Sequence, residues 1–246
     1  MKQTEIIMGM PITVEIPDKD TRKYVADIFS YFKKVDARYS TYKDDSEISQ
    51  INNGLPKSKW SAEMKKVLVL CEQTKKDTKG YFNITHNGKR DPSGLVKGWA
   101  INNAANMLRK KGVYNFCIEA GGDIQVNGQD TNNKPWTVGI RNPFNIDEVV
   151  KTITVGSEGV ATSGTYVRGQ HIYDPFNPNK KLNQVKSITV IGSDIYEADR
   201  YATAAFAMGV DGINFIKNIP RLEGYMITNN KAATYTSGFE RYVVNV

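Results

Sequence analysis

The chain of 246 residues is 40% hydrophobic and 24% charged, which is typical of a folded globular protein and excludes a disordered one. A formal net charge of +7 would attract anions. The lysines, however, are scattered in pairs along amphipathic segments. This pattern indicates a solvated surface, so nucleic acid is not expected as a partner.

The N-terminal half is predicted to be mainly helical, from the spacing of its apolar residues. In chain order we expect a strand within residues 6–16, a helix within 17–39, a loop and short helix in 40–54, a helix in 61–78, a strand in 81–85 and a helix in 95–112. Asp18 and Asp20 are candidate caps of the first helix. Ser46 and Glu47 are a candidate capping pair of the short helix.

The C-terminal half is predicted to be rich in strands. We expect two strands in residues 114–128 that turn at Gly121–Gly122, strands at 136–141, 149–155, 159–164 and 185–192, helices at 195–209 and 210–219, and strands at 223–228, 232–237 and 240–246. Strands 149–155 and 159–164 are expected to pair across a short turn. Because strands follow strands, the sequence favours an α+β fold with antiparallel sheets over a doubly wound one.

The two cysteines, Cys71 and Cys117, fit no CxxC pattern, so neither a zinc site nor a disulfide framework is indicated. Both are expected to be buried in apolar surroundings. The chain contains no apolar run of about 18 residues or more that would span a membrane. Taken as complete, the sequence predicts a cytoplasmic protein. If an export signal once preceded Met1, it predicts an extracytoplasmic, membrane-associated one.

The segment EADRYATAAFAMG, residues 197–209, places Asp199 and Thr203 four residues apart, so on a helix their oxygens project from one face. A carboxylate and a hydroxyl are hard-oxygen ligands that suit Mg²⁺, which keeps several waters and recruits phosphates. The alternative is a purely structural pair, an acidic residue in the first turn and a threonine bonded back to the helix. Either role is compatible with the spacing.

The segment DPSGLVKGWA, residues 91–100, combines Asp91, a glycine and Lys97 at the opening of a helix, which is a ready site for an anion. The alternative is an Asp-Pro turn that caps the helix. Further on, Gly121–Gly122 precedes Asp123. Paired glycines allow the backbone to approach a flat ligand closely, or they simply form a hairpin turn.

The segment ATSGTYVRGQHIYDP, residues 161–175, ends a strand where Ser163, Arg168 and His171 could converge. An imidazole with a pKa near 6.5 can accept a proton from a hydroxyl at neutral pH, and Asp174 could orient it. A structural histidine is the alternative. No nucleophile elbow supports a hydrolase triad.

In order along the chain, seven segments resemble the ApbE family of FAD:protein FMN transferases. These segments are MGMPITV (8–14), STYKDDSEISQIN (40–52), FNIT (82–85), DPSGLVKGWA (91–100), EAGGDIQVNG (119–128), ATSGTYVRG with HIYDP (161–175) and EADRYATAAFAMG (197–209). The resemblance implies one domain over residues 1–246, with the ApbE-like (T-fold-like) arrangement of antiparallel sheets flanked by helices.

The resemblance also implies a Mg²⁺-dependent enzyme that cleaves FAD, moves FMN onto a Thr or Ser hydroxyl of a partner flavoprotein and releases AMP. The acceptor could be a subunit of a membrane-associated redox complex. The resemblance implies that Asp199, Thr203 and the carbonyl of Gly94 bind the metal, and that His171 is either the proton acceptor or a contact to the reacting phosphate. The residues implied for FAD binding are Met8, Tyr42, Asn83, Ile84, Thr85, Asp91, Lys97 and Ile172.

The chain departs from the family pattern at several points. Asn83 stands where the family usually has Asp, Met10 replaces a threonine, and the stretches from Thr85 to Asp91 and from Arg168 to His171 are short. Two alternatives to FMN transfer therefore stay open. One is hydrolysis of FAD to FMN and AMP, and the other is a non-catalytic protein that binds FAD.

Overall fold

The structure is a computed structural model that describes residues 1–18, 21–165, 172–177 and 181–244. Its strands are β1 (Lys2–Ile7), β2 (Met10–Glu15), β3 (Thr85–His86), β4 (Lys89–Arg90), β5 (Phe116–Ala120), β6 (Asp123–Asn127), β7 (Trp136–Asn142), β8 (Asn145–Val155), β9 (Gly159–Gly164), β10 (Val185–Gly192), β11 (Glu223–Thr228) and β12 (Ala233–Tyr235). Its α-helices are α1 (Arg22–Tyr39), α2 (Glu47–Asn52), α3 (Ala62–Asp77), α4 (Ser93–Lys110), α5 (Ile195–Ala207) and α6 (Gly212–Lys217), with short 3₁₀ helices η1 (Lys57–Lys59), η2 (Gly209–Asp211) and η3 (Phe239–Tyr242).

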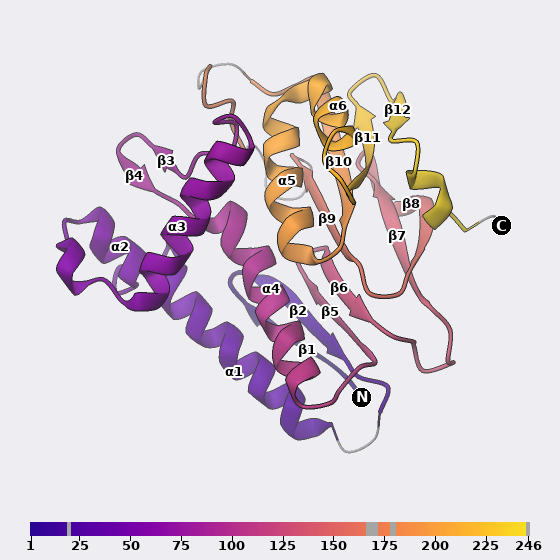
Figure 1. Ribbon diagram of the computed structural model, residues 1–246, viewed down its shortest axis with the longest axis horizontal. Coiled ribbons are helices and arrows are strands. Elements are labelled where there is room, and N and C mark those ends of the chain that lie inside the picture. The colour runs from indigo at the N-terminus through magenta and orange to yellow at the C-terminus, as the bar shows by residue number, and fades with distance from the viewer. Residues whose placement is uncertain (19–20, 166–171, 178–180, 245–246) are drawn as a thin grey trace.

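An eight-stranded sheet in the order β1-β2-β5-β6-β9-β10-β11-β12 forms the centre of the molecule (Figure 1). Each pairing within it is antiparallel. Two further hairpins, β3-β4 and β7-β8, form separate two-stranded sheets. The predicted α+β class with antiparallel sheets flanked by helices is therefore confirmed.

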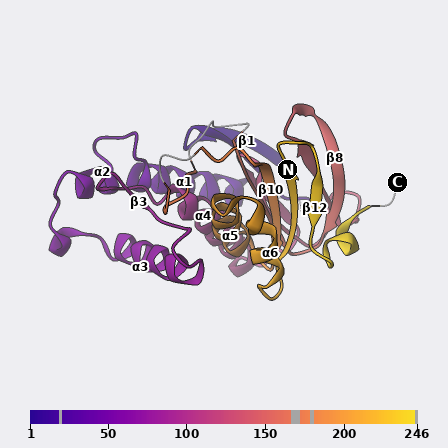
Figure 2. The same cartoon turned by 90° about the horizontal axis from the view of Figure 1, so that it is seen from above.

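One face of the large sheet is covered by helices. Helices α4 and α5 pack against each other, α4 over β5 and β6 and α5 over β9 and β10, while α1 packs on α4 and β1. Figure 2 shows α2, α3 and β3 gathered at one end of the molecule and β8 and β12 at the other. The buried residues of α1 follow the helical period that its sequence predicts, at Val25, Ile28, Phe29, Phe32, Val35 and Tyr39.

The opposite face of the sheet is covered by the β7-β8 hairpin and η3. Trp136, Val138 and Ile153 from the hairpin and Phe239 from η3 pack with residues such as Ile191 of β10. Strand β10 is consequently buried along nearly its whole length. A strand that is covered on both faces need not alternate apolar and polar residues. The sequence of β10, VKSITVIG, shows no strict alternation.

The predicted strand within residues 6–16 is in fact two strands, because the chain reverses at Met8–Gly9. Both residues have positive φ, 57° and 70°. Such a turn matches the twist of a β-hairpin and requires residues in the left-handed region, which glycine adopts without strain. Gly121–Gly122, with φ of 58° and 93°, forms the predicted turn between β5 and β6.

Three other predictions about strands are wrong. Residues 81–84 form no strand, and the ladder there is confined to Thr85–His86 with Lys89–Arg90. Strands β8 and β9 do not pair, because β8 joins β7 on the far face while β9 enters the large sheet. Residues 239–242 form η3 rather than a strand, and Val243 makes one isolated bridge to Ile153.

The predicted helix caps are partly correct. Ser46 caps α2 by accepting a hydrogen bond from the N–H of Ser49 at 3.1 Å. The Glu47 carboxylate instead accepts from the N–H of Ser61 at 2.6 Å, which joins α2 to the start of α3. The N-cap of α1 is Thr21 rather than Asp18, and Asp20 lies outside the described residues.

Cys71 is buried, as predicted, and burial raises the pKa of its thiol to about 12. Cys117 is only partly buried. Among the described residues, no helix is both long and apolar enough to cross a bilayer.

Candidate functional site

The close approach of α4 and α5 creates the site. Gly98 lies at the contact, and a Cβ atom there would stand 2.6 Å from Cβ of Asp199 and 2.7 Å from the carbonyl oxygen of Ile195. The N–H of Gly98 donates a hydrogen bond to Asp199 Oδ2 at 2.8 Å. A glycine in α4 therefore lets α5 bring its carboxylate against the backbone of α4, where the N–H fixes one of its oxygens.

Three oxygen donors converge beside this contact. Thr203 lies one turn after Asp199 on the same face of α5, and its Oγ1 is 3.5 Å from the carbonyl oxygen of Gly94 in the first turn of α4. This distance is long for a hydrogen bond between two oxygens, so the hydroxyl and the carbonyl lie side by side. The structure thus brings together Gly94, Asp199 and Thr203, the three residues predicted to bind metal.

Lys97 joins this group through an ion pair that the sequence analysis did not predict. Its Nζ is 2.7 Å from Oδ2 of Asp123 and 3.9 Å from Oδ1 of Asp199. Asp123 is the first residue of β6, just after the Gly121–Gly122 turn, and is 1% exposed. Its other oxygen accepts a hydrogen bond from the N–H of Thr162 at 3.2 Å. The carboxylate of Asp123 thereby holds Lys97 over the sheet.

The site is buried and carries an excess of negative charge. Burial raises the pKa of Asp199 to about 7, Lys97 opposes this shift, and the neighbouring carboxylate of Asp123 adds to it. One ammonium group faces two carboxyl groups that are almost inaccessible to water. Such a site is electrostatically suited to an additional cation.

The residues present fit Mg²⁺. The donor set of one carboxylate, one hydroxyl and one main-chain carbonyl consists of oxygens alone, which is the preference of this ion. Among the described residues, no group of three or more Asp, Glu, His or Cys side chains could hold a metal. A site with one carboxylate ligand agrees with that finding, because Mg²⁺ takes few protein ligands and completes its shell with water and phosphate oxygens.

The predicted FAD ligands Asn83, Ile84 and Thr85 form one short segment. Tyr173 holds this segment in place. The hydroxyl of Tyr173 donates to the carbonyl oxygens of Asn83 at 3.0 Å and Thr85 at 3.2 Å. The ring of Tyr173 also packs on His86, with 4.4 Å between centroids. Ile172, which precedes Tyr173 in the sequence, is buried in the main core. These predicted ligands therefore lie in one connected region of the structure.

Asp91 links this region to the metal-ligand candidates. Its N–H donates to the carbonyl oxygen of Ile84 at 2.7 Å, and its Oδ1 accepts from the N–H of Ser93 at 2.9 Å. The side chain thus bonds the backbone at the start of α4, the capping role that the sequence left as an alternative to ligand binding. Asn83 makes a similar local bond, since its Oδ1 accepts from the N–H of Thr85 at 3.1 Å.

The remaining predicted ligands are less constrained. Met8 lies in the β1-β2 turn and is partly buried against the core, whereas Tyr42 is 97% exposed in the turn after α1. His171 and Arg168 lie outside the described residues. The assignment of His171 as proton acceptor therefore stays a prediction, as do the flavin contacts of Met8 and Tyr42.

Arg200, which follows Asp199, fastens α5 to α3 and was not singled out from the sequence. Its guanidinium pairs with Asp77 of α3 at 2.8 Å and with Glu197 at 2.8 Å, and it stacks 4.1 Å from the ring centroid of Tyr201. Only 9% of the side chain is exposed. The helix that carries Asp199 and Thr203 is thus tied to α3 through the residue next to Asp199.

Arg200→Met is expected to lower the free energy of unfolding by about 2 kcal/mol. The loss is smaller than for a fully buried pair, because the Asp77 and Glu197 side chains are 27% and 30% exposed and regain water. Denaturant unfolding followed by circular dichroism measures it. Arg241→Met is the matched control, since that side chain is 59% exposed in its pair with Glu223. An equal loss in both variants would contradict the role assigned to Arg200.

Fold and site together define an α+β protein with a buried site whose oxygen ligands are of the kind that suits a divalent cation. The sequence model of the ApbE family matches residues 8–89 and 86–226, so the chain belongs to the ApbE family. A relative from Vibrio cholerae, named FAD:protein FMN transferase, is 34% identical over 129 residues, which is 48% of this chain and 38% of the relative. One of the same name from Haemophilus influenzae is 25% identical over 278 residues, covering 86% of this chain and 80% of the relative.

Solved structures confirm the fold over the full chain. The flavin transferase ApbE from Vibrio cholerae matches with a TM-score of 0.84 and 22% identity, covering 98% of each chain. The ApbE protein from Thermotoga maritima matches with a TM-score of 0.87 and 21% identity, covering 100% of this chain and 99% of that one. The matches to the curated Vibrio cholerae and Klebsiella pneumoniae relatives span 38% and 46% of those proteins, less than half of their length.

Proposed function

We propose that this protein transfers FMN from FAD to a Thr or Ser hydroxyl of an acceptor flavoprotein, in a Mg²⁺-dependent reaction that releases AMP. The observation that carries the proposal is the convergence of Gly94, Asp199 and Thr203 beside Lys97 in a buried site. Membership of the ApbE family and the printed names of the curated relatives support it.

The proposed reaction exchanges the phosphoanhydride bond of FAD for a phosphate ester bond to the acceptor hydroxyl. The acceptor oxygen bonds to the phosphorus on the FMN side of the pyrophosphate, the bond from that phosphorus to the bridging oxygen breaks, and AMP leaves with that oxygen. The hydroxyl proton passes to a base, for which His171 is the candidate by family resemblance. Such transfers depend on positioning and electrostatic stabilisation more than on covalent catalysis.

Each described residue of the site would have a separate role in this reaction. Asp199, Thr203 and the Gly94 carbonyl would hold Mg²⁺, which when bound neutralises the charge of the phosphates. The N–H of Gly98 fixes the orientation of Asp199, and Asp123 fixes Lys97. Lys97 supplies one positive charge at the position where the pyrophosphate would meet the site. Burial strengthens each of these charge interactions.

The proposal is tested by incubating the purified protein with FAD and Mg²⁺, with and without a recombinant acceptor domain from a flavoprotein that carries FMN on threonine. AMP is measured by chromatography, and covalent flavin by its fluorescence in a denaturing gel. AMP and covalent flavin that appear only with acceptor and Mg²⁺ support transfer. AMP without acceptor indicates FAD hydrolysis, and bound FAD without AMP indicates a carrier, so either result contradicts the proposal.

A further inference from the structure

The tip of the β7-β8 hairpin exposes apolar side chains at one end of the molecule. Phe144 is 40% exposed and Ile146 is 47% exposed. The tip is a defined turn, because the N–H of Phe144 donates to Asn142 Oδ1 at 3.0 Å and Glu148 accepts from the side-chain amides of Asn142 and Asn145. These apolar groups are therefore held in place at the surface rather than carried on a loose loop.

Two lysines from other strands converge on Phe144. Lys186 of β10 has its Nζ 5.8 Å from the ring centroid, and Lys231, in the turn between β11 and β12, has its Nζ 5.5 Å away. Within the described ranges, neither ammonium forms an ion pair. The two ammonium groups beside the half-exposed ring of Phe144 therefore give this surface a positive charge. A carboxylate of a partner protein can offset that charge.

A hollow of about 460 Å³ opens beside these lysines. It is lined by Gln184, Val210, Thr228, Asn229, Asn230 and Ala232. Lys231 belongs to the same turn as Asn230 and Ala232, so the hollow continues the surface around Phe144. We call Phe144, Ile146, Lys186, Lys231 and this hollow the hairpin patch. Exposed apolar groups, a few charges and a concavity are the usual anatomy of a protein interface.

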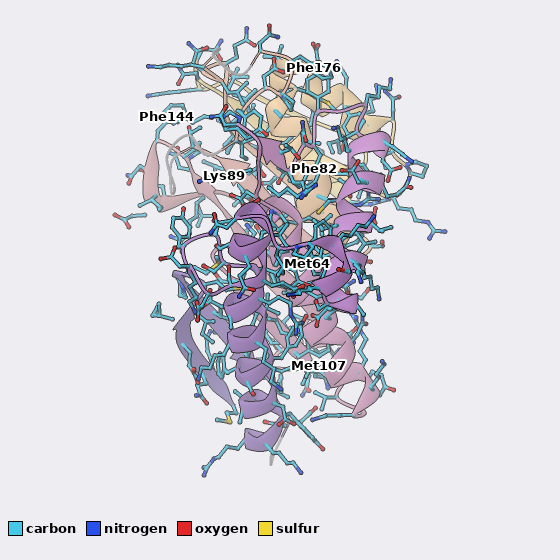
Figure 3. The ribbon with its side chains drawn as sticks, turned by 90° about the vertical axis from the view of Figure 1, so that its left-hand side faces the viewer. Met64, Phe82, Lys89, Met107, Phe144 and Phe176 are labelled. Carbon is cyan, nitrogen blue, oxygen red and sulfur yellow. The ribbon has the colours of Figure 1, made fainter. Side chains whose placement is uncertain are left out.

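The hairpin patch is connected to the site through neighbouring strand ends of the large sheet. Lys186 lies next to Ser187 in β10, and Ser187 pairs with Gly164 at the end of β9. Two residues before Gly164 in β9 is Thr162, whose N–H donates to the Asp123 carboxylate. In Figure 3, which looks along the longest axis of the molecule, Phe144 lies in the same half of the view as Phe82 and Phe176, and Met107 lies in the other half. Phe82 is within reach of Gly94, since it would contact a Cβ atom there at 3.4 Å.

We propose that the hairpin patch is the docking surface for the acceptor protein, which presents a carboxylate flanked by apolar side chains to Lys186, Lys231 and Phe144. The inference rests on the proposed FMN transfer, because it assumes a protein acceptor. The ends of β9 and β10 connect the patch to Thr162, whose N–H contacts Asp123, so an acceptor docked here lies toward the strand ends that carry the site.

The test compares the wild-type protein with Lys186→Glu/Lys231→Glu and with Phe144→Ala, using the acceptor domain of the transfer assay. Lys110→Glu, at the far end of α4, is a control for a change of charge away from the patch. The double variant is expected to lower kcat/KM for the acceptor at least about 10-fold, mainly through KM. Phe144→Ala is expected to lower it by about 5-fold or more. FAD affinity, measured by flavin fluorescence, is expected to equal that of the wild-type protein in every variant.

The outcomes separate the inference from the proposed function. A wild-type protein that transfers no FMN overturns both. Wild-type transfer combined with an unchanged KM for the acceptor in the double variant overturns the docking surface alone. Binding to vesicles of anionic phospholipid that depends on the two lysines, without any effect on transfer, would assign the hairpin patch to a membrane and also overturn the inference.

Discussion

Asp199→Asn is expected to abolish Mg²⁺-dependent cleavage of FAD and, in the same protein, to raise the stability of the metal-free form at pH 8. Loss of the carboxylate ligand removes several kcal/mol of charge stabilisation, so turnover should fall by about 10³-fold or more. The amide keeps the shape of the side chain. Its oxygen can still accept from the N–H of Gly98, while its nitrogen can face Asp123.

The stability gain follows from the raised pKa of Asp199. In the unfolded chain this carboxyl titrates near 3.8, and burial moves its pKa in the folded protein to about 7. Between these values unfolding releases a proton, so the group destabilises the fold progressively as pH rises from about 4 to about 7. Above that range the full cost is present. The amide does not ionise and avoids this cost, which amounts to up to about 4 kcal/mol for the pKa shift from 3.8 to about 7.

Thermal unfolding at pH 5 and pH 8, in EDTA and in excess Mg²⁺, measures this effect. The advantage of Asp199→Asn should be larger at pH 8 and should shrink or reverse in Mg²⁺, which stabilises only a protein that binds it. Thr203→Val is the control that removes a ligand without removing a charge. It should lose turnover without the pH-dependent gain. A variant that is less stable than wild type at pH 8 without metal would refute the electrostatic account.

The parts of the site that sequence could predict are those set by local geometry. Asp199 and Thr203 share a face because a helix repeats every 3.6 residues, and the apolar period of residues 195–207 predicts that helix. The turn at Gly121–Gly122 was predictable for the same kind of reason, since paired glycines adopt positive φ without strain. The Gly94 carbonyl was assigned by family resemblance, and the structure places it beside Thr203.

The contacts that sequence could not predict join segments far apart in the chain. Asp123 meets Lys97 because β6 lies beneath α4, and no spacing in either segment reveals this pairing. Arg200 looks like an ordinary exposed residue of an amphipathic helix until α3 is placed against it. Gly98 occurs in the interior of a helix, where glycine is unfavourable, and only the position of α5 explains it.

The errors in the strands have a similar origin. Residues 149–155 and 159–164 have the composition of paired strands, but the turn between them carries the chain from one layer to the other. In that turn the carboxylate of Glu158 accepts from the N–H groups of Gly156 and Ser157. The apolar residues of β8 then pack on the face opposite α5. Which layer a strand joins depends on the burial of its whole face and not on the length of the loop.

Gly98→Ala is expected to lower both stability and metal affinity, because the added methyl group has no room at the contact between α4 and α5. Its Cβ atom would stand 2.6 Å from Cβ of Asp199 and 2.7 Å from the main-chain oxygen of Ile195, which cannot move independently of α5. Overpacking of this kind costs about 3 kcal/mol, and the better helix propensity of alanine returns about 1 kcal/mol. The net loss of about 2 kcal/mol should lower the midpoint of thermal unfolding by about 4–8 °C.

The same methyl group should weaken the metal site by pushing α5 away from α4. Asp199 and Thr203 move with α5, whereas the Gly94 carbonyl stays with α4, so the three oxygens separate. The Mg²⁺ concentration for half-maximal FAD cleavage should rise by about 10-fold or more, since small displacements at a reacting centre have large effects. Gly156→Ala is the control, because a Cβ atom there meets nothing within 4 Å. If Gly98→Ala unfolds at the wild-type temperature and needs no more Mg²⁺ than wild type, the contact between the two helices does not set the geometry of the site.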